Sequence, residues 1–146
     1  MPSHTESVLI RRPVAEVFAY MDDIDREREW QPQLLEAEQS PPGPTQVGTR
    51  RRYVSDFMGR RLENTYLVTV YEPDQRLVCE SAPGSALQAT SEIQWEAVDG
   101  GTLVTMGLEG SPSGALRFVP GKLLEGVFRK EVESALARVK EILERP

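Results

Sequence analysis

The sequence has very few of the side chains that usually build disulfides, metal clusters and catalytic dyads. Among its 146 residues Cys79 is the only cysteine and His4 is the only histidine. One cysteine can form neither an intramolecular disulfide nor a thiolate metal cluster. His4 lies near a chain end, where segments commonly fray, so we do not expect it to act as a general base. We therefore expect no metal site and no cofactor, and we name no catalytic residue.

Long apolar runs and a strongly basic surface are also missing. Charged residues interrupt every apolar stretch well before the roughly 20 residues that cross a bilayer. The first residues lack the basic start and apolar block of a secretory signal, so a cytoplasmic location is the expectation. The formal net charge of −6 argues against a nucleic-acid partner, which would need a basic face. We expect the arginines at 50–52 and 60–61 to form a solvated hairpin face rather than an anion site.

The length fits one domain, which begins with a strand and two short helices. Residues 6–11 read as the strand, and Pro13 suits the first position of a helix. Apolar residues then recur at helical spacing: Val14, Val17, Phe18 and Met21. Asp22 and Asp23 should cap that helix or start the next one, at 25–30, before Pro32 stops it.

A proline-rich loop separates this opening from a predicted meander of five strands. Residues 39–46 hold three prolines and a glycine without helical or strand periodicity. From Val47 onward, β-branched and aromatic residues alternate with turn signals. A long amphipathic helix follows, with its regular part expected to begin near Leu123 because Pro120 and Gly121 precede it. Its apolar stripe is Leu124, Phe128, Val132, Ala135, Val139 and Ile142.

The turns predict which strand residues share a face of the sheet. Asp99-Gly100 favours a two-residue hairpin loop that pairs Val98 with Gly101. This register puts Trp95 opposite Val104, Ile93 opposite Met106 and Ser91 opposite Leu108 on one apolar face. The loop of the hairpin at 57–60 is either 58–59 or 59–60, and both choices group Tyr53, Ser55 and Phe57 with Leu62, Asn64, Tyr66 and Val68.

Two further connections complete the predicted inner face. A four-residue turn at 72–75 would pair Val70 with Leu77 and Val68 with Cys79. The connection around Pro83-Gly84 must have an odd length or a bulge, because an even length would turn Leu87 and Ala89 outward.

The order of these elements resembles the helix-grip fold of the START-like (SRPBCC) superfamily, which includes polyketide cyclases, dehydrases and lipid-transport domains. The local matches are IRRPVAEVF at 10–18, MDDI at 21–24, EWQP at 29–32, VGT at 47–49 and GGT at 100–102. The resemblance covers essentially the whole chain, 1–146. It implies an α+β fold in which a curved antiparallel sheet of about six strands, in the order β-α-α-β-β-β-β-β-α, wraps a long C-terminal helix. It also implies a cavity between sheet and helix that holds an apolar molecule in many members.

The predicted faces sort the candidate cavity residues. Every strand glutamate considered falls on the outer face, which argues against carboxylate acid–base catalysis in the cavity; these are Glu63, Glu80, Glu92, Glu96 and Glu109. We expect the acidic residues at 22, 23 and 25 to be helix caps, because they lack calcium-loop spacing. Arg51 is left open as a further inward group. The predicted cavity residues are Trp30, Tyr53, Asn64, Tyr66, Cys79, Ser81, Ser91, Trp95, Met106, Leu124 and Phe128.

These residues favour a binding protein over two alternatives. A small hydrophobic or amphipathic molecule, such as a lipid, polyketide or aromatic compound, would be oriented by Tyr53, Asn64 and Tyr66. Cys79 is expected to be a small apolar filler rather than a nucleophile. The first alternative is a cyclase or dehydrase in which Tyr53 or Tyr66 polarises a carbonyl. The second is a protein-interaction module with a filled core, and a homodimer is left open.

Overall fold

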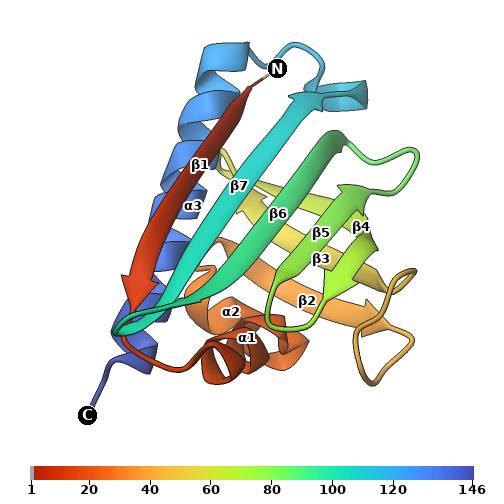
Figure 1. Cartoon of the computed structure of the whole chain (residues 1–146). Coiled ribbons are helices and arrows are strands. Elements are labelled where there is room, and N and C mark those ends of the chain that lie inside the picture. The colour runs from red at the N-terminus through yellow and green to blue at the C-terminus, as the bar shows by residue number, and fades with distance from the viewer. Residues whose placement is uncertain (1) are drawn as a thin grey trace.

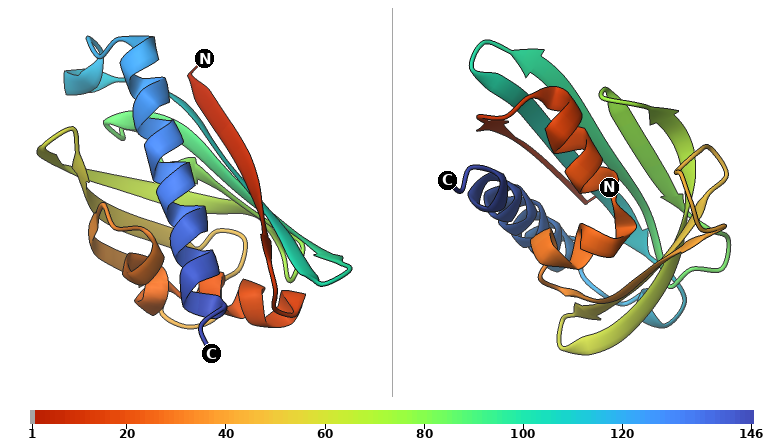
Figure 2. Two further views of the ribbon diagram at one scale, coloured as in Figure 1. Left: turned by 90° about the vertical axis from the view of Figure 1, so that its left-hand side faces the viewer. Right: turned by 90° about the horizontal axis from the view of Figure 1, so that it is seen from below.

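The computed structural model describes residues 2–146, apart from the side chain of Ala115. Within these residues one antiparallel sheet has the strand order β1-β7-β6-β5-β4-β3-β2. The strands are β1 (Ser3–Ile10), β2 (Leu34–Ser40), β3 (Arg50–Phe57), β4 (Arg60–Glu72), β5 (Arg76–Ser81), β6 (Leu87–Val98) and β7 (Gly101–Pro112). The helices are α1 (Val14–Asp22), η1 (Ile24–Arg26), α2 (Glu27–Trp30), η2 (Gly114–Leu116) and α3 (Gly121–Leu143). The sheet curves around α3, as Figures 1 and 2 show, and this confirms the predicted helix-grip fold.

The described chain has seven strands where we predicted about six. The missed strand is β2, which includes residues 39 and 40 of the predicted loop. Its outward side chains Glu36 and Glu38 lie 3.5 Å from the guanidinium of Arg52 on β3. An edge strand has one partner and can be rich in charge, so its sequence lacks the apolar alternation that identified the others.

The hairpin predictions at Asp99-Gly100 and at 57–60 are confirmed. Val98 pairs with Gly101, and this register continues along β6 and β7. In the earlier hairpin the loop is Met58-Gly59, because Phe57 pairs with Arg60. Both loop residues have positive φ, 55° and 81°, as a type I′ turn requires.

The β4–β5 connection differs from the prediction but leaves the inner face unchanged. Glu72 pairs with Arg76, so the loop is one residue shorter than predicted and Val70 pairs with Val78 rather than Leu77. A bulge between Val68 and Val70 then shifts the register back, and Val68 pairs with Cys79 as predicted. The next connection has the odd length that we required, and Leu87 and Ala89 are buried.

The helix boundaries follow the sequence signals closely. The carboxylate of Asp23 accepts a hydrogen bond from the backbone N–H of Asp25, so it caps η1 as predicted. Helix α3 begins at Gly121, directly after Pro120, which is earlier than the predicted start near Leu123. Proline is tolerated there because the first N–H groups of a helix have no intrahelical acceptor.

The apolar core lies mainly between α3 and the β1–β7 side of the sheet. Helix α3 also contacts α2, which closes the lower end of the fold in Figure 1. Phe18 of α1 packs edge-on against Trp95 with ring centroids 4.8 Å apart. No helix in residues 2–146 is both long and apolar enough to cross a membrane. This asymmetric packing leaves space between α3 and the β3–β5 side of the sheet.

Candidate functional site

A partly open cavity of about 90 Å³ occupies this space. Its apolar wall comes from β3 to β7, with Met21 of α1 and Leu34 of β2 at one end. Its polar groups come from α2 and the segment that follows it, from β3, β4 and β6, and from α3. The lining residues are Met21, Glu27, Gln31, Gln33, Leu34, Arg51, Tyr53, Ser55, Phe57, Leu62, Asn64, Tyr66, Leu77, Cys79, Leu87, Ser91, Ile93, Met106, Leu108 and Glu131.

The predicted cavity residues divide into two groups. Those that line the cavity are Tyr53, Asn64, Tyr66, Cys79, Ser91 and Met106. Those that lie elsewhere are Trp30, Ser81, Trp95, Leu124 and Phe128. Trp30 and Trp95 belong to the main core, in which Phe18 of α1 packs edge-on against Trp95. Leu124 and Phe128 pack behind Phe57 and Leu87, so they support the wall from outside it.

Asn64 and Ser81 connect the sheet at the point where β5 ends. The Asn64 amide donates to the Leu87 carbonyl at 2.9 Å, and its oxygen accepts from the Leu87 N–H at 3.3 Å. Ser81 donates to the same carbonyl at 2.8 Å and accepts from the Ala89 N–H at 2.9 Å. These side chains supply hydrogen bonds to β6 beyond the end of β5. The Asn64 amide, which we expected to orient a ligand, is therefore already hydrogen-bonded to the backbone of β6.

A buried ion cluster forms one end of the cavity. Arg51, 1% exposed, lies 2.8 Å from a carboxylate oxygen of Asp22 and 3.9 Å from one of Glu27. Thr45 accepts a further hydrogen bond from Arg51 at 2.9 Å. Asp22, which we expected to cap a helix, is the last residue of α1, and its carboxylate instead accepts hydrogen bonds from Arg51, Thr45 and Tyr71. Arg50, Arg60 and Arg61 are exposed as predicted, so the solvated interpretation fails only for Arg51.

Glu27 is a buried carboxyl group on the cavity wall that the sequence analysis missed. The Tyr53 hydroxyl donates to it at 3.0 Å and the Gln31 amide at 2.5 Å. Burial raises the pKa of Glu27, and Arg51 partly offsets this rise. Burial also raises the pKa of Tyr53 well above its ordinary value, so its hydroxyl stays protonated. Trp30, three positions along the same short helix, was the signal that this face points inward.

Glu131 is a second carboxyl group in the cavity, and it comes from α3. It lies three positions after Phe128 and four before Ala135, which are both buried, so it is on the inward stripe of the helix. Burial raises the pKa of Glu131 from 4.5 to about 7. Within residues 2–146 its carboxyl group has no hydrogen bond or ion pair. The strand glutamates do not line the cavity, as predicted, but the helices bring Glu27 and Glu131 to it, so the argument against carboxylate chemistry from the strands alone is incomplete.

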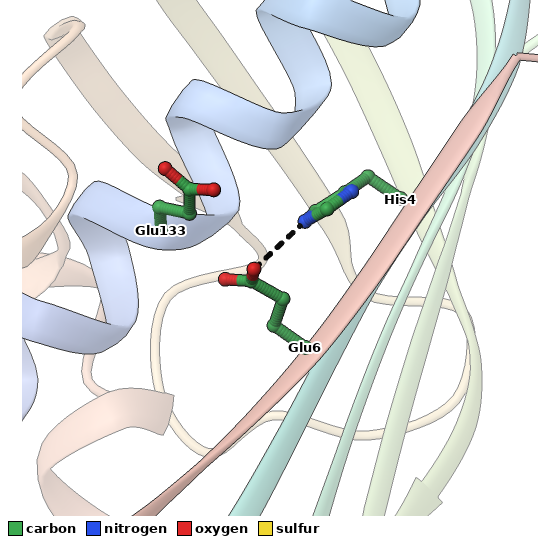
Figure 3. A group of neighbouring side chains, drawn as sticks. All are labelled: His4, Glu6 and Glu133. Atoms are coloured by element: carbon green, nitrogen blue, oxygen red, sulfur yellow. Dashed lines mark ion pairs between the residues drawn. The ribbon is translucent and has the colours of Figure 1, made fainter.

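The remaining groups with catalytic potential in the sequence are Cys79 and His4. Burial raises the pKa of the Cys79 thiol to about 12, so it stays protonated at neutral pH. His4 lies in β1, paired with Leu108, rather than in a frayed end. Its Nε2 is 3.2 Å from Glu6, and Glu133 of α3 lies across from both, as Figure 3 shows. The potential ligand atoms of these three residues lie within 4.8 Å of one another, outside the cavity.

Solved structures share this fold at low sequence identity. A START superfamily protein from Mycobacterium smegmatis aligns with a TM-score of 0.79 at 12% identity, over 97% of both chains. A protein from Thermus thermophilus gives 0.77 at 19% identity, again over 97% of both chains. The di-domain ARO/CYC StfQ from the steffimycin biosynthetic pathway gives 0.77 at 13% identity, over 98% of this chain and 50% of that chain.

The sequence itself identifies the family. Comparison with curated proteins found no match. A family model described as polyketide cyclase / dehydrase and lipid transport matches residues 1–144, nearly the full length. The strand order, the gripped C-terminal helix and the START-type structural neighbours agree with that match. The chain therefore belongs to the polyketide cyclase / dehydrase and lipid-transport family.

Proposed function

We propose that this protein binds a small apolar or amphipathic molecule in the cavity between α3 and the sheet. The observation that carries the proposal is a partly open cavity with apolar walls and a few converging polar groups. Such an arrangement is typical of small-molecule sites, in which apolar area supplies affinity and polar groups fix orientation. A module with a filled core is not favoured, because the space is present.

The size of the cavity restricts how a ligand enters. An apolar cavity of about 150 Å³ holds one benzene molecule, and the cavity here is about 90 Å³. A larger ligand must therefore extend through the open side or push a wall outward. Helix α3 packs mainly on β1 and β7, so the β3–β4 hairpin is the wall held less firmly by the helix.

Tyr66 is the hydroxyl best placed to orient the ligand. The Tyr53 hydroxyl already donates to Glu27, and the Asn64 amide is used by the backbone of β6. Burial raises the pKa of Tyr66 to about 12, so its hydroxyl can donate a hydrogen bond at neutral pH. We therefore assign the orienting role to Tyr66 before Tyr53 or Asn64.

Fluorescence titration with the neutral probe N-phenyl-1-naphthylamine tests binding. Ser91→Leu and Ser55→Leu each add volume to the cavity wall on different strands. Thr90→Leu makes a similar addition on the outer face of β6, where Thr90 pairs with Glu109 and Glu80. We expect both cavity variants to bind at least about tenfold more weakly than wild type, and Thr90→Leu to match it.

Two results would refute the binding proposal. One is an absence of probe binding to the wild-type protein. The other is unchanged affinity in both cavity variants, when circular dichroism shows that they are folded. Native mass spectrometry of protein purified from its own host is an independent test, because it would identify any retained ligand directly.

A cyclase or dehydrase activity is the second candidate, and Glu131 is the observation that favours it. A general base works best when its pKa lies near the working pH, and burial brings the pKa of Glu131 to about 7. Tyr66, on the same cavity, could polarise a carbonyl. Turnover of an unreduced polyketide thioester that falls at least about tenfold in both Glu131→Gln and Tyr66→Phe would support it. Turnover equal to wild type in both variants would refute these roles.

A further inference from the structure

We infer that the ligand presents a cationic or hydrogen-bond-donating head group to Glu131, and that carboxylate and phosphate head groups are rejected. This inference rests on the proposed binding function and specifies the chemistry of its ligand. It predicts that amines and alcohols bind and that fatty acids and phospholipids do not. The size and apolar walls of the cavity alone would not distinguish these two groups of compounds.

Most donors of the cation on the cavity, Arg51, already have partners in the protein. Nη2 of Arg51 donates to the carboxylate and the backbone carbonyl of Asp22, at 2.8 and 3.0 Å. The same nitrogen lies 2.9 Å from Thr45, and Nε donates to Gln39 at 3.1 Å. The remaining nitrogen, Nη1, is 3.9 Å from Glu27. An anionic ligand that approached Nη1 would come close to the carboxylate of Glu27, which repels it, and the other donors of the guanidinium are occupied.

The acidic groups of the cavity are in excess over this cation. Glu27 and Glu131 line the cavity, and Asp22 is connected to them through Arg51, which partly neutralises Asp22 and Glu27. Glu27 also accepts hydrogen bonds from Tyr53 and Gln31. Glu131 lines the same cavity, is half-buried, and receives no such donor within residues 2–146. A ligand that displaces water from this side of the cavity would leave the carboxylate unpaired against apolar surface, which is costly unless the ligand itself supplies a donor.

The neighbours of Glu131 strengthen this preference. It follows Phe128 and precedes Val132 and Ala135 on α3, and all three are buried and apolar. Charge–charge interactions are weakly screened in such surroundings. An ammonium group beside Glu131 would form a charge-assisted hydrogen bond, whereas a carboxylate there would be repelled. Tyr66, also on the cavity, can accept from an ammonium group or donate to a carboxylate, so it does not reverse the choice.

Three naphthalene derivatives with the same apolar body test the inference: 2-naphthylmethylamine, 2-naphthalenemethanol and 2-naphthoate. Isothermal titration calorimetry at pH 7.5 would measure each with wild-type protein, with Glu131→Gln and with Glu133→Gln. Glu133 lies on the same helix but outside the cavity and is exposed, so it is a matched control for the loss of one charge. We expect the amine to bind wild type at least about tenfold more tightly than the carboxylate.

The variants distinguish Glu131 from the general charge of the protein. In Glu131→Gln the amine should weaken at least about tenfold while the alcohol changes less than about threefold. Glu133→Gln should bind all three compounds as wild type does. A carboxylate that binds wild type as tightly as the amine would overturn the inference and leave the binding function intact. If none of the three binds although N-phenyl-1-naphthylamine does, the inference fails and the binding function stands; if the probe does not bind either, both fail.

Discussion

Replacement of Glu131 by glutamine should stabilise the protein, and the gain should depend on pH. In the unfolded chain this carboxyl group ionises near 4.5, whereas in the folded protein burial moves its pKa to about 7. Between these two values the folded protein holds the extra proton, so stability falls as pH rises. Above pH 7 the loss is complete, because the carboxylate is then charged in both states.

The size of the effect follows from the same shift. The difference between 4.5 and about 7 corresponds to about 3 kcal/mol at pH 7.5 and to less than 1 kcal/mol at pH 5. Because water and structural relaxation reduce such penalties, these are upper limits. A neutral glutamine avoids the penalty, so Glu131→Gln should gain most at pH 7.5 and little at pH 5.

Urea denaturation of wild type, Glu131→Gln and Glu133→Gln at both pH values measures this gain. The exposed Glu133 should change stability by less than about 0.5 kcal/mol. A destabilised Glu131→Gln at pH 7.5, or a gain that is equal at the two pH values, would refute the assignment of Glu131 as a desolvated carboxyl group. Higher stability of Glu131→Gln would also fit a ligand-binding role for Glu131, because functional groups are often held at a cost in stability.

Three further predictions concern the rest of the fold. Gly126→Ala should raise the free energy of unfolding by about 0.5–1 kcal/mol, since a Cβ at this helical position meets nothing within 4 Å; a lower urea midpoint would contradict this. Arg51→Met should lower the free energy of unfolding by about 3–5 kcal/mol, because it leaves the carboxyl groups of Asp22 and Glu27 without their cation. Wild-type stability in this variant would show that the cluster is not coupled to folding. Cys79, 4% exposed with a thiol pKa of about 12, should react with a maleimide at pH 7 only in urea. Rapid labelling of the native protein would contradict this and show that reagents reach Cys79 through the cavity.

Local sequence patterns were sufficient to predict most of the sheet. Asp99-Gly100 determined the β6–β7 register because a two-residue loop permits one pairing, and the alternation then assigned the faces. The β4–β5 hairpin shows the limit of this logic. Its shorter loop shifts the register by one residue, and a bulge at Thr69 shifts it back. The Val68–Cys79 pair was therefore predicted correctly, although neither the loop length nor the bulge was.

The cavity itself depends on tertiary structure. The helical period of α3 can be read from the sequence and places Glu131 on its apolar stripe, but it does not tell which part of that stripe meets core and which meets open space. That division arises in the folded protein, where Phe128 packs against Phe57 and Leu87 while Glu131 lines the open space. Arg51 and Glu27 are similarly far apart in sequence and meet only when α2 docks under the sheet. Periodicity alone therefore determined which residues face inward, and the docking of the helices decided which inward groups are packed and which are free to meet a ligand.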